Sequence, residues 1–191
     1  YWVSSLISGF NCGNEKSDFK QLGVNPNAEL YVINSSIFKN NKTNYDFEAV
    51  IDGIKFADEN NINVIYIPLT FVGYDNNQMY YMEKAIKDYL NKENRAIVSV
   101  FGNKPMKSES KPIPCILEGV ICVGGISQSG YFWDGAVHGN KSIDIYAPSE
   151  KLIGGIDRNG RRLQLDGVSG AGAIVAGMIS TIILDDDYMV K

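Results

Sequence analysis

Three stretches of the chain are almost continuously apolar, and they limit its fold more than any other feature of the sequence. They are residues 63–69 (NVIYIPL), 96–101 (AIVSVF) and 119–124 (GVICVG). Short apolar runs without polar alternation are typical of strands buried on both faces of a parallel sheet. Residues 47–60 and 79–91 each precede one of these runs and carry apolar residues at helical spacing. Buried strands that alternate with amphipathic helices predict β-α-β units, and therefore an α/β fold with a mostly parallel sheet.

Other segments extend this pattern toward both ends of the chain. Residues 28–35 (AELYVINS) and 142–147 are predicted to be further strands, the first of them parallel to the buried runs. A polar hairpin is expected around residues 157–160, before a closing helix whose apolar run reaches from 173 to 184. No repeat or linker interrupts the pattern, so residues 1–191 are interpreted as one domain.

The composition is that of an ordinary globular protein, because 45% of the 191 residues are hydrophobic and 21% are charged. The net charge is −4 and the sequence has no cluster of lysine and arginine, which argues against a nucleic-acid partner. The apolar run 173–184 is too short to cross a bilayer, so we expect no transmembrane segment in this chain. The chain starts at Tyr1 without an initiator methionine, and we interpret it as part of a longer protein.

The cysteines and the glycosylation sequons bear on the compartment. The three cysteines cannot all pair within the chain and lack metal-site spacing, and we interpret them as small buried apolar residues: Cys12, Cys115 and Cys122. Three sequons give weak support for a secreted, extracellular protein that follows the secretory pathway; they begin at Asn34, Asn41 and Asn140.

The start of the closing helix, residues 166–177 (DGVSGAGAIVAG), places one hydroxyl, Ser169, among glycines and alanines. The simplest interpretation is a serine that caps the helix. A cap needs no cleared space around it, however, whereas small neighbours let another backbone approach the hydroxyl closely. Free N–H groups at a helix N-terminus also stabilise developing negative charge, as acyl transfer requires. A G-x-S-x-G nucleophile elbow is a weaker alternative, because Ala171 stands in place of the second glycine.

Residues 167–184 resemble the active-serine helix of the subtilisin-like serine proteases, whose pattern is G-T-S-M-A-x-P-H-V-A-G-x-x-x-L. Four further blocks match that family in its order, so that the resemblance covers nearly the whole chain: LGVNPNAELYVI (22–33), VIDGIKFADENNINVIYIPLT (50–70), AIVSVFGN (96–103) and VICVGGISQSGYFWDGAVHGNKSIDIYAPS (120–149). The resemblance implies a three-layer αβα fold with a mostly parallel sheet. It also implies a serine peptidase that cleaves peptides or proteins.

By this resemblance, Ser169 is the acyl-enzyme nucleophile and Asn103 donates its side-chain amide to the oxyanion. Two edges are implied to pair with an extended substrate backbone; they consist of Leu69 and Thr70, and of Val100, Phe101 and Gly102. Calcium is the only cofactor that the resemblance suggests. The loop from residue 9 to 21 is longer than the family's, so the usual calcium loop cannot be carried over.

The chain also departs from the family. The family's catalytic Asp and His lie upstream of the segment that matches Tyr1, and the chain's single histidine, His138, matches a surface turn. Several family residues are replaced, at Val168, Gly170, Ala173 and Ile174 in the serine block and at Pro68 and Thr70 on the substrate edge. Two hypotheses stay open: a divergent endopeptidase whose Asp and His lie outside this chain, and an inactive pseudoprotease that binds a partner.

Both hypotheses share an expectation about the sheet. The strand that carries the family's catalytic Asp is central in the sheet and lies upstream of this chain, so the implied sheet has a gap with unpaired strand edges. Such edges are costly. We therefore expect an N-terminal segment or a second chain to complete the domain, and we expect residues 1–191 alone to be inactive as a peptidase.

Overall fold

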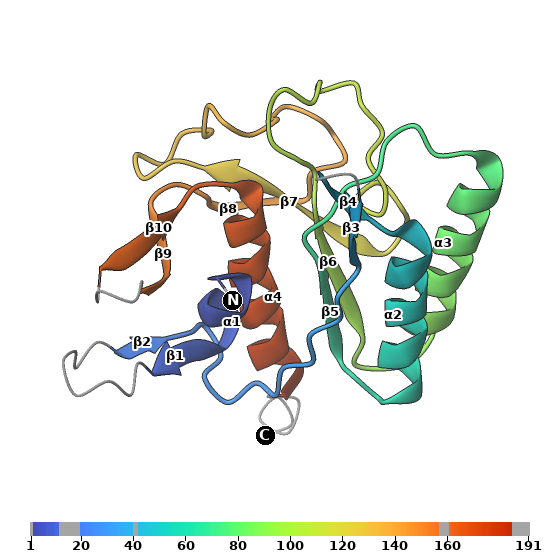
Figure 1. Cartoon of the computed structure of the whole chain (residues 1–191), viewed down its shortest axis with the longest axis horizontal. Helices are drawn as coiled ribbons and strands as arrows, with labels where there is room; N and C mark the ends of the chain where they lie inside the picture. The colour runs from blue at the N-terminus through green and yellow to red at the C-terminus, as the bar shows by residue number, and fades with distance from the viewer. Residues whose placement is uncertain (1, 12–19, 40–41, 157–160, 185–191) are drawn as a thin grey trace, which may run out of the picture.

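Four parallel strands form the main sheet of the computed structural model, which describes residues 2–11, 20–39, 42–156 and 161–184 (Figure 1). Their spatial order is also their order in the chain: β5 (Val64–Ile67), β6 (Ala96–Val100), β7 (Val120–Ile126) and β8 (Ile145–Pro148). The register pairs Val64 with Ala96 and Ile97 with Val120. The three apolar runs thus contain the first three strands of this sheet, β5, β6 and β7, and the predicted parallel sheet is confirmed.

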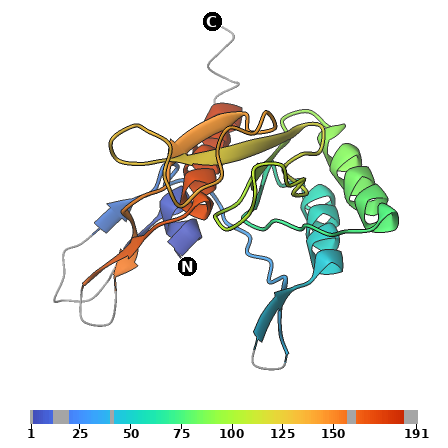
Figure 2. The ribbon, with the colours of Figure 1, turned by 90° about the horizontal axis from the view of Figure 1, so that it is seen from above.

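Helices cover both faces of this sheet (Figures 1 and 2). On one face lie α2 (Phe47–Glu59) and α3 (Asn76–Leu90). On the other face the long helix α4 (Val168–Leu184) crosses β6, β7 and β8, with the short helix α1 (Trp2–Ser8) beside it. The predicted three-layer αβα arrangement is confirmed.

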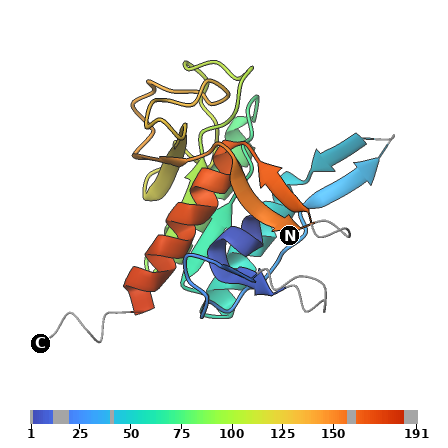
Figure 3. The ribbon, with the colours of Figure 1, turned by 90° about the vertical axis from the view of Figure 1, so that its left-hand side faces the viewer.

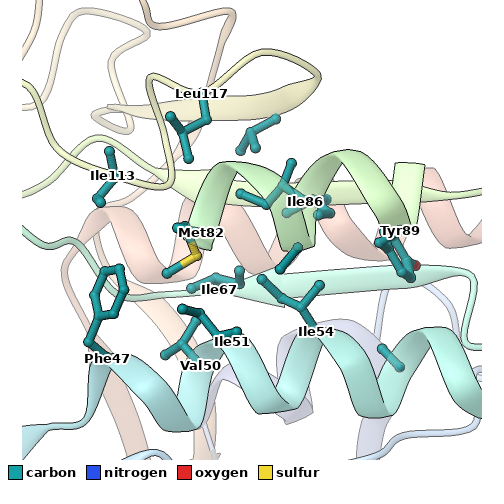
Figure 4. Close-up of a cluster of buried hydrophobic side chains, with 14 residues drawn as sticks. Phe47, Val50, Ile51, Ile54, Ile67, Met82, Ile86, Tyr89, Ile113 and Leu117 are labelled. Atoms are coloured by element: carbon teal, nitrogen blue, oxygen red, sulfur yellow. The ribbon is translucent and has the colours of Figure 1, made fainter. Parts of the chain in front are cut away.

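The strand β5 shows how side chains divide between the two layers. Ile65 and Ile67 point into the cluster formed with α2 and α3, where Ile54, Met82 and Ile86 are almost fully buried (Figure 4). Val64 and Tyr66 pack instead against the cluster under α4. The alternation follows from the two-residue period of a strand. Residues on β5 therefore reach either the α2–α3 core or the neighbourhood of Ser169.

The helix α3 begins three residues before its predicted start at residue 79. The Asp75 side chain accepts a hydrogen bond from the Gln78 N–H (2.8 Å), and the Gln78 side chain accepts one from the Asp75 N–H (3.1 Å). This is a capping box. Its residues are polar, so a prediction based on apolar spacing places the start of the helix too late.

Three small antiparallel hairpins lie outside the main sheet (Figure 3). They are β1 (Gly9–Asn11) with β2 (Lys20–Leu22), β3 (Ser36–Lys39) with β4 (Lys42–Tyr45), and β9 (Leu152–Ile156) with β10 (Arg162–Leu165). The last is the expected polar hairpin, although its turn at 157–160 lies outside the described residues. The hairpin β3–β4 projects from the body of the molecule (Figure 2).

The prediction of a strand at residues 28–35 is wrong. This segment is in no strand, and Val32 is 83% exposed. It runs beside α2, where the Tyr31 ring lies 6.3 Å from that of Phe56 and Ile33 covers Gly53. A strand needs hydrogen-bonded neighbours as well as the right composition, and no described strand lies beside this segment to pair with it.

Two of the cysteines form a disulfide, which corrects their interpretation as unpaired apolar residues. Cys115 and Cys122 are bonded across seven residues, with their Cα atoms 4.9 Å apart. Both are buried in a cluster with Phe101, Val137 and Ile143. The disulfide therefore ties the connection between β6 and β7 to the strand β7 itself. Cys12 lies outside the described residues.

We expect peptide mapping without reduction to recover residues 115 and 122 in one cross-linked species, and thiol titration of the unfolded chain to count one free cysteine. Replacing both residues by alanine should lower the free energy of unfolding by about 2–3 kcal/mol, because the unfolded chain loses a closed loop. Denaturant titration measures this change. Recovery of the two cysteines in separate alkylated peptides from the native protein contradicts the pairing.

Candidate active site

The first turn of α4 carries Ser169. The helix begins at Val168, after Gly167 turns the chain with φ of +144° and donates its N–H to the Ser149 carbonyl (2.7 Å). Ser169 is thus the second helical residue and not the cap, which removes the simplest interpretation of its hydroxyl. Its side chain is half-buried, at the end of a helix whose free N–H groups carry partial positive charge.

The cap comes from Asn103, which lies 65 residues earlier in the chain. Its Oδ1 accepts a hydrogen bond from the Val168 N–H at 3.1 Å. Asn103 follows the end of β6 through Gly102, which has φ of +137° and whose added Cβ would lie only 2.8 Å from the Met106 sulfur. The end of β6 and the start of α4 therefore meet at this contact.

This contact fixes which way the Asn103 amide faces. Since Oδ1 accepts from the helix, Nδ2 keeps its two N–H donors, and none of them is bonded to another described residue. The Asn103 side chain is exposed, so these donors are accessible. An amide donor beside a helix N-terminus is a suitable environment for an oxyanion that forms next to the Ser169 hydroxyl.

Sequence reasoning missed Tyr66 on β5. Its hydroxyl donates to the backbone carbonyl of Ser169 at 2.5 Å. Burial raises the pKa of Tyr66 well above its ordinary value, so the hydroxyl stays protonated and remains a donor. The contact joins residues 103 positions apart, and the only sequence signal for it is the glycine at 172, which leaves room for the ring.

The residues predicted to form substrate edges differ in whether their backbone N–H and C=O groups are free to bind a peptide. The backbone groups of Leu69 and Thr70 make no hydrogen bond to the described residues, and both residues are half-buried. On the other edge, the Phe101 N–H already donates to Val123 and the Gly102 carbonyl accepts from Val137. The side chains of Val100 and Phe101 are buried. Whether these residues bind substrate stays a prediction, and Leu69–Thr70 is the better placed edge.

His138 lies on the surface, as expected. Its ring is exposed and stacks on Phe132 with 4.9 Å between ring centroids, and the Gly139 N–H beside it donates to Tyr146. None of its described contacts is to Ser169 or Asn103. Nothing in these contacts makes His138 a base for the serine.

No metal site is apparent in the part of the chain that the structure describes. Among residues 2–11, 20–39, 42–156 and 161–184, no group of three His, Cys, Asp or Glu side chains could hold an ion. Most of the loop after β1 lies outside these ranges. We derive no calcium site. In the same described ranges, no helix is long and apolar enough to cross a membrane.

A groove of about 370 Å³ separates the extended segment after β2 from the edge strand β5. Its walls are residues 27–31 on one side and Asn63, Val64 and Tyr66 on the other, while Ala176 and Ser180 of α4 also line it. β5 is the first strand of the sheet, and no described strand pairs with its outer edge. The groove therefore borders backbone groups that are free to bind another strand.

Comparison with known proteins places the chain in a family. The model described as the subtilase family matches residues 4–189, which is nearly the whole chain, and the chain belongs to this family. The match includes both Asn103 and Ser169. No curated protein sequence matches the chain.

Solved structures give the same fold. The self-cleaved protease domain of PatA has a TM-score of 0.75 at 20% identity, over 98% of this chain and 67% of that one. EpiP, the epidermin leader peptide processing serine protease of Staphylococcus aureus, has a TM-score of 0.75 at 20% identity, over 99% and 53%. The PatG macrocyclase in complex with peptide has a TM-score of 0.73 at 22% identity, over 98% and 53%. The chain thus spans just over half the length of EpiP and PatG.

Two variants of Asn103 should separate its role as a helix cap from its amide donors. Asn103→Ala removes the acceptor for the Val168 N–H and should lower the free energy of unfolding by about 1 kcal/mol. Asn103→Asp keeps an oxygen acceptor at a helix N-terminus, where negative charge is favourable, and should leave the stability unchanged or higher. Thermal and denaturant unfolding measure both. Equal losses in the two variants contradict the capping contact.

Proposed function

We propose that the chain is the serine-bearing part of a subtilisin-like endopeptidase domain, which cleaves peptide bonds through an acyl-enzyme on Ser169. The observation that carries this proposal is the hydrogen bond between Asn103 and the first residue of α4. It brings a side-chain amide donor to the helix end that presents the serine. The leader peptide processing protease and the peptide-bound macrocyclase among the structural neighbours support a peptide or protein substrate.

In this proposal the Ser169 Oγ attacks the carbonyl carbon of the scissile bond, and its proton passes to a histidine supplied by another segment. The carbonyl oxygen becomes an oxyanion, which accepts hydrogen bonds from Asn103 Nδ2 and from the N–H of Ser169 in the first turn of the helix. Collapse of this intermediate breaks the C–N bond, and the histidine returns the proton to the leaving amine. Water then hydrolyses the ester by the same route in reverse.

The general base and its carboxylate partner come from a segment outside residues 1–191, as an N-terminal portion of the same polypeptide or as a second chain. The groove beside β5 supports this part of the proposal, because an extended strand placed there completes the sheet between β5 and the segment at 28–33. The same strand would also lie beside the exposed apolar side chains of that segment, which are Leu30, Tyr31 and Val32.

Hydrogen exchange in the complete protein tests the completed sheet. The Ala96 N–H donates to the Asn63 carbonyl, so in β5 the amides of Ile65 and Ile67 face β6 whereas those of Val64 and Tyr66 face the groove. We expect all four amides to exchange slowly, because a strand in the groove protects the outer pair. Rapid exchange at Val64 and Tyr66 beside slow exchange at Ile65 and Ile67 indicates an open edge and contradicts the proposal.

The chemistry is tested by labelling with a fluorophosphonate, which reacts with activated serines. The complete protein should be labelled at Ser169, and Ser169→Ala should abolish both labelling and peptide cleavage. Residues 1–191 alone should react orders of magnitude more slowly, since no base is present to take the serine proton. Asn103→Asp should lower kcat by about 10²–10³-fold with little effect on stability, because it removes the oxyanion donor and keeps the cap.

One set of results favours the pseudoprotease instead. If the complete protein cleaves nothing in a broad peptide library and binds a partner equally well with Ser169→Ala, the cleft serves binding alone. The replacement of family residues by Val168 and Ala173 beside the serine is the observation that keeps this alternative under test.

Location outside the cytoplasm is part of the proposal. The Cys115–Cys122 disulfide supports it, because structural disulfides persist in oxidising compartments. The sequons carry less weight than the disulfide does. The Asn140 side-chain nitrogen already donates to the Ser108 carbonyl, and Asn41 lies outside the described residues.

A further inference from the structure

We propose that Tyr66 is a positioning residue that makes the geometry of Ser169 depend on what fills the groove beside β5. This inference rests on the proposed function. It adds a residue, Tyr66, and a link between the groove and Ser169, neither of which the peptidase chemistry itself requires. Tyr66 is half-buried, and it is the one residue of the described chain that both lines the groove and bonds the Ser169 backbone.

The first observation is the contact at the nucleophile. The Tyr66 hydroxyl donates to the Ser169 carbonyl at 2.5 Å, within the first turn of α4. In a helix this carbonyl also accepts from the N–H of the residue four positions on, which is Ala173. The tyrosine therefore holds the peptide unit that follows the serine, and that unit sets the direction of the Ser169 Cα–Cβ bond.

The second observation is the space made for the ring. A Cβ added at Gly172 would lie 2.7 Å from the Tyr66 Cε2 atom, 2.8 Å from its hydroxyl oxygen and 2.7 Å from a methyl group of Val100. Any side chain at this position must displace the tyrosine or the core. The helix thus has a glycine where the tyrosine reaches the serine carbonyl, and the contact depends on both residues.

The third observation is the wall of the groove. Tyr66 lines it beside Val64, opposite the extended segment that contains Leu30. A strand seated in the groove packs against this wall and limits the rotation of the tyrosine side chain about its χ1 and χ2 bonds. The hydrogen bond to the Ser169 carbonyl forms without such a strand, but the tyrosine side chain then has more freedom to rotate and the bond breaks more often. The position of the nucleophile then depends on occupancy of the groove.

The test is a double-mutant cycle in the complete protein. Tyr66→Phe removes only the hydroxyl, and Leu30→Ala weakens the opposite wall without altering Tyr66. We expect Tyr66→Phe to lower kcat about tenfold with KM unchanged, because the serine is misplaced while substrate binding is retained. Leu30→Ala should lower kcat when Tyr66 is present and have no further effect in the Tyr66→Phe background.

Tyr89→Phe is the matched control. Tyr89 is fully buried and its hydroxyl also donates to a backbone carbonyl, that of Ile62, at 2.7 Å. Its removal costs a comparable hydrogen bond on the far side of the sheet from α4. We expect Tyr89→Phe to lower stability and leave kcat unchanged. Equal kcat values for Tyr66→Phe and Tyr89→Phe overturn the proposal, as do independent effects of Leu30→Ala and Tyr66→Phe.

A second readout separates this inference from the proposed function. If the wild-type protein proves inactive, the peptidase proposal fails, and exchange of the Ala173 amide still reports the first turn of α4. Leu30→Ala should speed this exchange in the Tyr66 background and not in the Tyr66→Phe background. Equal acceleration in both backgrounds overturns the dependence on Tyr66, whatever the activity of the protein.

Discussion

The close approach of α4 to the sheet is the constraint on which the rest of this structure depends. Three glycines of the helix face parts of the chain that leave no room for a side chain: Gly170 faces Leu152, Gly172 faces Tyr66, and Gly177 faces Val24. The alanines between them are buried against β6 and β7. Glycine in a helix interior costs roughly 1 kcal/mol relative to alanine. In return, the small residues let α4 pack close to the sheet, which brings the start of the helix to the end of β6.

Most of the architecture could be predicted from the sequence because it depends on local patterns. Continuous apolar runs gave β5, β6 and β7, and helical spacing gave α2 and most of α3. The segment at 28–35 has an equally good strand pattern and is not a strand, because pairing depends on a neighbour that the pattern does not contain. The Cys115–Cys122 disulfide was missed for a similar reason, since spacing does not reveal which cysteines the fold brings together.

The candidate site was predictable in part. Resemblance to a family predicts roles for Ser169 and Asn103, and the structure brings Asn103 into contact with the residue before the serine. Nothing in the sequence distinguishes the cap of α4 from its second residue, because the cap is a side chain that only the fold brings to the start of the helix. The Tyr66 hydroxyl reaches the Ser169 carbonyl across 103 positions of the sequence, and only the glycine at 172 hints at this contact.

The outer edge of β5 has a consequence for how this chain behaves at high concentration. The strand Val64–Ile67 carries no charge and no proline, which are the usual features that keep an edge from pairing with other molecules. Beside it lie exposed apolar side chains, Val32 among them. Residues 1–191 purified alone therefore present a template for strand addition, and copies of the chain can join through it into dimers and larger aggregates. In the complete domain proposed above, the strand in the groove covers these N–H and C=O groups and removes the template.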